Sequence, residues 1–159
     1  MQTIKADITS ITRGIIAHGC NCSGGFGSGV AGAIAWRFPE VKKAYHAHQA
    51  TNTPRPDLLG TIQPVKITDE LYVVNLFTQL EYGSDGRRYA SVEAITEAIV
   101  ELHLWREDSQ LIHLPIHIPK IGSLRGGLDW ETEVKPIFLW FEQQTPPDEN
   151  GEFILCVVD

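Results

Sequence analysis

Residues 18–31, HGCNCSGGFGSGVA, have the residue types and spacing that best predict chemistry. An apolar run, residues 14–17, precedes and a helix-like run, residues 30–36, follows a cluster of four glycines in this stretch, Gly24, Gly25, Gly27 and Gly29. Because glycine lacks a Cβ, it tolerates positive φ and lets a ligand approach the main chain closely. Successive amide groups in such a loop can converge on an anion, and the helix that follows adds the positive end of its dipole. The pattern therefore predicts a phosphate site made by the backbone.

A second glycine-rich loop, residues 119–128 with the sequence PKIGSLRGGL, also follows an expected strand and precedes an expected helix. In an open α/β sheet, ligands bind at the carboxyl ends of strands, where adjacent crossovers diverge. Two such loops from neighbouring strands could hold a diphosphate between them. Neither loop ends in the Gly-Lys-Ser/Thr of a P-loop, and neither has the spacing of a dinucleotide fingerprint. ATPase and dehydrogenase activities are therefore disfavoured.

Alternating strand and helix patterns predict an α/β fold around these loops. We expect strands over residues 3–8, 13–18, 59–67, 70–77, 111–118 and 153–158. We expect helices over residues 30–38, 40–48, 90–107 and 130–142. Asp129 has the position of an N-cap for the last helix, and Pro136 is expected to kink that helix or to remove one of its hydrogen bonds. Polar connections are expected over residues 51–56, 81–88 and 145–151.

Composition limits the classes of function. The 159 residues are enough for one domain, and the formal net charge of −7 disfavours a general polyanion binder, which carries a basic face. Three cysteines, Cys20, Cys22 and Cys156, form no even disulfide framework and are typical of a reducing compartment. Cys20 and Cys22 have no second ligand pair at metal-finger spacing, so we expect no metal and no cofactor. No apolar run has transmembrane length, and the start of the chain does not resemble a signal sequence. We expect a cytoplasmic protein without a membrane partner.

Four segments in order resemble the macro domain, an α/β fold that binds ADP-ribose. Residues 5–9, KADIT, resemble the opening Gly-Asp-Ile-Thr signature of the family, and residues 18–21, HGCN, lie where many members carry Asn-Ala-Ala-Asn. Residues 26–31 and 121–128 resemble the two phosphate loops. The resemblance covers nearly the whole chain. It implies that residues 1–159 form a single three-layer α-β-α macro domain with a central mixed, mostly parallel sheet.

Within that family, the pattern His-x-Cys-Asn-Cys-x-Gly most resembles the ADP-ribose 1″-phosphate phosphatases of fungi and similar phage and bacterial proteins. The Leu-Phe-Thr at residues 76–78 and the Leu-Leu-Gly at residues 58–60 add to this likeness. The resemblance implies a phosphoric monoester hydrolase that binds ADP-ribose and converts ADP-ribose 1″-phosphate to ADP-ribose and phosphate. The implied partner is a small-molecule ADP-ribose derivative.

Two other functions stay open. One is removal of ADP-ribose from protein or DNA, or of acetate from O-acetyl-ADP-ribose; a nucleic acid is expected as a partner only as such a modified substrate. The glycohydrolases that resemble this chain place a catalytic lysine where it has Gln79, and Asp129 has the position of a helix cap, which weakens this alternative. The other is a reader that binds ADP-ribose without chemistry.

The resemblance also implies roles for individual residues. Asp7 would accept a hydrogen bond from the adenine amino group, and Ile8 would pack against the ring or donate its amide. Asn21 would bind the distal ribose, and Phe26 would cover it, although either side chain could instead serve the loop alone. Further implied ligand contacts are Gly19, Cys20, Gly27, Ser28, Gly29, Val30, Ala31, Phe77, Ile121, Gly122, Ser123, Leu124, Arg125, Gly126 and Gly127.

Hydrolysis of a phosphate monoester needs an in-line water, charge relief on the phosphoryl oxygens and a proton for the leaving oxygen. His18 is the first candidate for acid/base work, because imidazole titrates near neutrality and lies three residues before Asn21. The alternative for His18 is a buried structural histidine. Asp85 is a second candidate, to orient the water, and its alternative is an ordinary turn aspartate. Arg125, or the two arginines that follow Asp85, could neutralise the phosphate.

Overall fold

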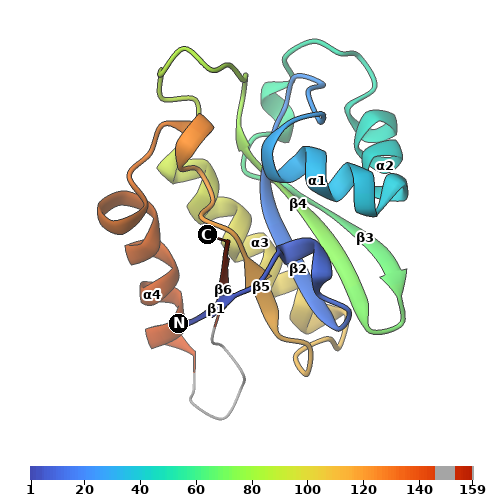
Figure 1. Cartoon of the computed structure of the whole chain (residues 1–159), viewed down its shortest axis with the longest axis vertical. Coiled ribbons are helices and arrows are strands. Elements are labelled where there is room, and N and C mark those ends of the chain that lie inside the picture. Colours follow the sequence, from blue (N-terminus) through green and yellow to red (C-terminus); the bar gives the residue numbers. More distant parts are fainter. Residues whose placement is uncertain (146–152, 159) are drawn as a thin grey trace.

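The computed structural model in Figure 1 describes residues 1–145 and 153–158 of the chain. The polar connection expected over residues 145–151 lies outside the described residues, except for Thr145. The described helices include none that is both long and apolar enough to cross a membrane.

Six strands form one sheet in the order β1-β6-β5-β2-β4-β3. All neighbouring strands are parallel except β3, which runs antiparallel to β4. The carboxyl ends of five strands therefore meet at one edge of the sheet. The strands are Gln2–Lys5 (β1), Gly14–Asn21 (β2), Ile62–Thr68 (β3), Leu71–Gln79 (β4), Ile116–Ile118 (β5) and Phe153–Val157 (β6).

Helices cover both faces of this sheet. In Figure 1, α1 and α2 lie over one face, and α3 and α4 lie over the other, which confirms the three-layer α/β architecture and the mixed, mostly parallel sheet. The helices are Gly29–Arg37 (α1), Pro39–Gln49 (α2), Val92–Asp108 (α3) and Lys135–Gln144 (α4). Short 3-10 turns occupy Ile8–Ser10, Pro56–Leu58 and Leu124–Gly126.

Each face of the sheet buries its own hydrophobic cluster. Side chains alternate between the two faces along a strand, so Ile15 and Ala17 of β2 join the cluster under α3 and α4. Ile16 and Cys20 join the cluster under α1 and α2. Burial on both faces explains why β2 has an almost uninterrupted apolar sequence. It also holds the end of β2, where the first glycine-rich loop begins, in a rigid setting.

The strand expected over residues 111–118 is wrong in its first half, because β5 begins only at Ile116. The guanidinium of Arg106 is buried and donates hydrogen bonds to three carbonyl groups between residues 111 and 114. These bonds fix a turn in place of an extended strand. Similarly, the strand expected over residues 3–8 ends at Lys5, before a 3-10 turn.

The expected last helix is divided in two. It begins as a π-helical turn, Trp130–Val134, and continues as α4. The N-cap expected at Asp129 is confirmed: its carboxylate accepts hydrogen bonds from the backbone amide and the hydroxyl of Thr132, both at 2.9 Å. Pro136 lies in the first turn of α4, where the amide that proline lacks has no helical partner. It therefore begins a new helix after the wider turn.

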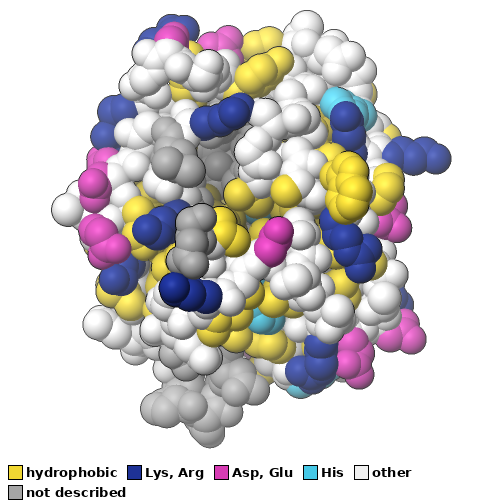
Figure 2. All heavy atoms as spheres, in the orientation of Figure 1, with side chains coloured by type: hydrophobic (Ala, Val, Ile, Leu, Met, Phe, Trp, Pro, Cys, Tyr) yellow, Lys and Arg dark blue, Asp and Glu magenta, His cyan; other side chains and the backbone are white. Residues whose placement is uncertain are grey.

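The two helical layers differ in charge. The sequences of α1 and α2 together contain three Lys or Arg residues and one acidic residue, Glu40. The sequence of α3 contains five acidic residues and one basic residue, the buried Arg106. On the face drawn in Figure 2, basic side chains lie over α1 and α2 around an exposed apolar group. One layer is thus net positive and the layer on the opposite face is net negative.

Candidate functional site

Three loops follow neighbouring strands at the carboxyl edge of the sheet. We call residues 22–28, after β2, the first loop; residues 119–128, after β5, the second loop; and residues 80–90, after β4, the bridging segment. Because β5 lies beside β2 and β2 lies beside β4, these three segments stand in that order along the edge. Asp7 follows β1, farther along the same edge.

The side chain of Asn21 holds the first loop closed. Its Nδ2 donates to the carbonyl of Gly25 at 2.6 Å. Its Oδ1 accepts from the amides of Ser23 and Gly25, at 2.9 and 3.2 Å, and from the hydroxyl of Tyr45 at 2.9 Å. Four hydrogen bonds to the protein make Asn21 a residue that shapes the loop. A ribose contact from this side chain stays a prediction.

Phe26 anchors the loop from below. Its ring is 2% exposed and lies 4.6 Å from the ring of Tyr45 and 5.6 Å from the imidazole of His18, measured between centroids. A ring enclosed by two other rings favours the alternative role, in which Phe26 fixes the first loop to the core. Cover of the distal ribose by Phe26 stays a prediction.

The backbone between Phe26 and α1 is open. A Cβ added at Gly27 or Gly29 would meet no atom within 4 Å, and Gly29 has a φ of +60°. Ser28 is the N-cap residue of α1, and its side chain makes no hydrogen bond to the first turn. The first amides of a helix have no partner within the helix, so residues 29–31 present donors at the positive end of the α1 dipole. This geometry supports the predicted phosphate site.

His18 lies beneath the first loop and has no exposed surface. Its Nε2 is 2.6 Å from Oδ1 of Asn75, whose Nδ2 donates to Oε1 of Gln63 at 3.0 Å. Burial lowers the pKa of His18 to about 4, against the opposing effect of the hydrogen bond with Asn75. A neutral imidazole without accessible surface favours the buried structural histidine, which supports the first loop. The acid/base role of His18 stays a prediction.

Four other predicted ligand contacts have buried side chains. They belong to the two hydrophobic clusters, so only their backbone groups can face a ligand. Burial also raises the pKa of the Cys20 thiol, which keeps that side chain uncharged in the core. Burial of their side chains favours contact through the backbone for Ile8, Cys20, Phe77 and Ile121, and their ligand contacts stay predictions.

Hydrogen bonds fold the second loop upon itself. The hydroxyl of Ser123 donates to the carbonyl of Lys120 at 2.6 Å, and the amide of Leu128 donates to the carbonyl of Gly122 at 3.0 Å. Arg125 is exposed on the adjoining 3-10 turn. The loop therefore has a fixed shape before any ligand binds, and it carries two cations at its surface, Lys120 and Arg125.

The second loop is locked to the bridging segment at two glycines. The carbonyl of Gly126 accepts hydrogen bonds from the amides of Tyr89 and Ala90, both at 3.0 Å. Gly127 has a φ of +79°, and a Cβ added there would lie 2.6 Å from the carbonyl oxygen of Arg87. Only glycine permits this approach of the two backbones. The position of the second loop thus depends on the bridging segment.

Asp85 folds the bridging segment. Its Oδ1 accepts from the hydroxyl of Tyr89 at 2.8 Å and from the amide of Arg87 at 3.2 Å, and its Oδ2 accepts from Nε of Arg87 at 2.8 Å. The hydrogen bond from Tyr89, followed by those from Arg87, lowers the pKa of Asp85. Both carboxylate oxygens are engaged within the segment. This arrangement favours the turn aspartate over a residue that orients water.

The two arginines that follow Asp85 are both paired with carboxylates. Arg87 bonds Asp85, as described above. Arg88 makes a two-pronged ion pair with Glu133, at 3.0 and 2.6 Å, and Oε2 of Glu133 also accepts from the amide of Asp129 at 2.8 Å. Arg88 thereby ties the bridging segment to the start of the π-helical turn.

Tyr82 is a residue of this edge that the sequence pattern does not mark. A Cβ added at Gly25 would lie 2.6 Å from Cε1 of Tyr82, so the ring rests directly on the first loop. The ring is 58% exposed. Its signal in the sequence is weak, a single aromatic residue in a polar connection. An accessible aromatic ring therefore does lie beside the first loop, but it comes from the bridging segment.

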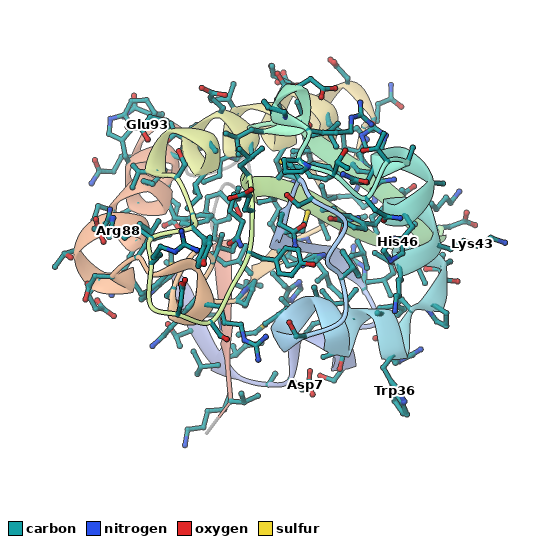
Figure 3. The ribbon with its side chains drawn as sticks, turned by 90° about the horizontal axis from the view of Figure 1, so that it is seen from above. Asp7, Trp36, Lys43, His46, Arg88 and Glu93 are labelled. Carbon is teal, nitrogen blue, oxygen red and sulfur yellow. The ribbon has the colours of Figure 1, made fainter. Side chains whose placement is uncertain are left out.

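Asp7 marks the other end of the edge. Its Oδ1 accepts hydrogen bonds from the hydroxyl and the amide of Thr9, at 2.7 and 2.9 Å. These bonds lower the pKa of Asp7, so the carboxylate is ionised at neutral pH. Figure 3 views the molecule from above and shows Asp7 and Arg88 well apart. Within the described residues, no three His, Cys, Asp or Glu side chains are grouped to hold a metal ion.

Comparisons with known proteins agree with this fold. No protein-family model matches the sequence. The chain is 30% identical over 160 residues to an ADP-ribose 1″-phosphate phosphatase of Meyerozyma guilliermondii, covering 82% of this chain and 88% of the relative. The structure is similar to the macrodomain of Mycobacterium tuberculosis DarG, with a TM-score of 0.77, 21% identity and coverage of 98% and 97% of the two chains. It is also similar to Thermosipho africanus DarTG in complex with ADP-ribose, with a TM-score of 0.74, 12% identity and coverage of 99% of this chain and 41% of that one.

Proposed function

The chain belongs to the macrodomain family, and from this premise we propose that it binds ADP-ribose and hydrolyses ADP-ribose 1″-phosphate to ADP-ribose and inorganic phosphate. One observation carries the proposal: the open, amide-lined start of α1 after β2, with the second loop following the neighbouring strand β5. A pyrophosphate can bind there through backbone donors, which suits a protein whose formal net charge is −7. We further propose that residues 1–159 act as a single macrodomain, in the cytoplasm and without a metal or other cofactor.

Strand order sets the direction of the bound ligand in this proposal. The adenine lies at Asp7 after β1, and the diphosphate lies between the second and first loops, after β5 and β2. The distal ribose then points toward the bridging segment after β4. Four inter-strand spacings separate β1 from β4, which corresponds to about 19 Å along the edge. An elongated ligand with a base at one end matches this arrangement.

Hydrolysis proceeds by attack of a water oxygen on the terminal phosphorus. The bond between phosphorus and the C1″ oxygen breaks, and that oxygen takes a proton from solvent. The amides of residues 27–31 and the α1 dipole relieve the charge that builds on the phosphoryl oxygens. Because His18 is buried, catalysis relies on positioning and on these fixed dipoles.

A non-catalytic reader is the second candidate, and a specific observation favours it. Neither His18 nor Asp85 has a side chain free for proton transfer at the phosphate. Removal of ADP-ribose from protein or DNA is less favoured, because the Gln79 amide, which donates to the carbonyl of Glu81 at 2.8 Å, offers no amine nucleophile.

A panel of ADP-ribose derivatives tests the proposal. We expect calorimetry to detect binding of ADP-ribose, and phosphorus NMR to detect inorganic phosphate released from the 1″-phosphate. O-acetyl-ADP-ribose and an ADP-ribosylated peptide should stay intact. Binding without turnover of any compound would favour the reader, and cleavage of the peptide alone would favour the glycohydrolase. A folded protein that does not bind ADP-ribose would contradict every one of these functions.

Asp7→Asn tests the adenine end of the site. The amide keeps an oxygen for Thr9 but loses the charged acceptor for the adenine amino group, so we expect the Kd for ADP-ribose to rise about 10–100-fold. The hypoxanthine analogue, which has a carbonyl in place of that amino group, should bind the variant better than the wild type, because Asn can donate. Calorimetry with both ligands, on the wild type and on the variant, measures this change of base preference. Equal losses for both ligands would place the base elsewhere.

A further inference from the structure

We propose that Tyr82 determines which groups may be attached to the distal ribose, and that it favours free ADP-ribose derivatives over ADP-ribose linked to a polypeptide. This inference rests on the proposed function, because it requires ADP-ribose to lie between the two loops. It concerns the end of the ligand that carries the reacting bond.

The bridging segment lies at the end of the site that is opposite to Asp7. The sheet order places β4 on the side of β2 that faces away from Asp7. A ligand with its base at Asp7 and its diphosphate between β5 and β2 therefore directs its distal end at the segment that follows β4. Tyr82 belongs to that segment.

The ring of Tyr82 packs on the first loop at Gly25. Three atoms of its ring, Cε1, Cζ and Cδ1, would lie 2.6 to 3.0 Å from a Cβ at Gly25. The ring therefore packs on the glycine backbone, while 58% of the residue stays exposed. Gly25 is two residues before Gly27, where the open part of the backbone begins. The accessible part of the ring thus stands beside the phosphate site.

The bridging segment, which carries Tyr82, is held in place at both ends. The hydroxyl of Ser23 in the first loop donates to the carbonyl of Leu80 at 2.5 Å, which fixes the start of the bridging segment. At its other end, the segment forms an isolated antiparallel bridge between Gln79 and Ala90. The ion pair of Asp85 with Arg87 folds the part between these ends. Tyr82 is therefore held as a fixed wall.

A fixed aromatic wall discriminates by size and polarity. A phosphate on C1″ is small, and its charge is met by the amides at the start of α1. A polypeptide on C1″ has to pass the ring and leave its own backbone groups without partners against an apolar face, which is unfavourable. The wall thus selects against the larger substituent and leaves affinity for ADP-ribose itself unchanged.

Binding measurements on the full chain test this inference. We compare the Kd for ADP-ribose with the Kd for a short peptide that carries ADP-ribose on a serine, a linkage chosen for its stability. In the wild type we expect the peptide to bind about tenfold more weakly. Tyr82→Ala should bring the two values within about twofold of each other, without weakening ADP-ribose binding by more than that factor. Tyr82→Phe should behave as the wild type.

Trp36→Ala is the matched control. Trp36 is also an exposed aromatic residue, 85% exposed, but it lies on α1 at the outside of the molecule in Figure 3. Its loss should leave the ratio of the two Kd values unchanged. An unchanged ratio in Tyr82→Ala overturns the inference, and so does loss of ADP-ribose binding in that variant. A wild type that does not bind ADP-ribose contradicts the proposed function instead, so the two failures are distinguishable.

Discussion

Gly127→Ala is expected to weaken ADP-ribose binding about 100-fold or more, because it displaces the second loop by roughly an ångström. The φ of +79° already disfavours a side chain at this position, and the new methyl group would lie 2.6 Å from the carbonyl oxygen of Arg87. Backbone atoms cannot yield to the methyl group as a flexible side chain can. The second loop and the bridging segment must therefore separate. Calorimetry measures the loss of affinity, and urea denaturation measures the accompanying loss of stability.

Gly86→Ala separates this clash from the strain of a positive φ. Gly86 has nearly the same φ, +83°, but a Cβ there would meet no atom within 4 Å. It should lower the free energy of unfolding by about 1 kcal/mol through strain alone and leave ADP-ribose binding within about twofold of the wild type. Equal losses of affinity in the two variants would show that the contact at Gly127 does not position the site.

His18→Gln is expected to remove much of the acid sensitivity of the fold. The pKa of His18 is lowered to about 4 in the folded state, against 6.5 for an ordinary histidine. Above pH 6.5 both states hold the neutral ring. As the pH falls from 6.5 towards 4, only the unfolded state gains a proton, so stability decreases. Between pH 7.5 and pH 5 this linkage amounts to about 2 kcal/mol.

Glutamine retains a donor for Asn75 in place of Nε2 but does not titrate. The variant should therefore lose about 2 kcal/mol less than the wild type between pH 7.5 and pH 5, whatever its stability at pH 7.5. The pKa values of His103 and His117 are also lowered by burial. They remain in both proteins and cancel in the comparison. Urea denaturation at the two pH values measures the difference, and an identical pH dependence would contradict a neutral buried His18.

Much of the fold follows from local patterns. The glycine-rich loops lie at strand ends because an apolar strand and a helix flank each of them, and Asp129 caps its helix as its residue type suggests. The first half of the strand expected over residues 111–118 failed for a reason that no local pattern contains. Arg106, on α3, satisfies the carbonyl groups there. A buried cation that reaches across the chain overrides strand propensity.

The site was predictable in its backbone and less so in its side chains. Gly27 and Gly29 predict an open loop from their residue type alone. Glycine has no Cβ and tolerates positive φ whatever its neighbours are, so the backbone there stays accessible. Whether a ring faces a ligand or the core depends on neighbours from other elements. Phe26 and Tyr82 illustrate this: α2 contributes the ring that encloses Phe26, whereas nothing encloses Tyr82. The imidazole of His18 was likewise neutralised by burial, which depends on packing.

The opposite charges of the two helical layers give the molecule an electric dipole moment that runs across the sheet, with its positive end on the side of α1 and α2. A diphosphate that diffuses toward the protein is repelled by the α3 side and attracted to the side of α1 and α2, the layer that also contributes the first-turn amides of the site. Encounters are thereby guided, although the protein as a whole has the same sign of charge as its ligand. Dissolved salt screens this guidance at distances beyond a Debye length, which is about 8 Å at physiological ionic strength. Association should therefore slow as salt is added, while the amide contacts that hold the bound ligand persist.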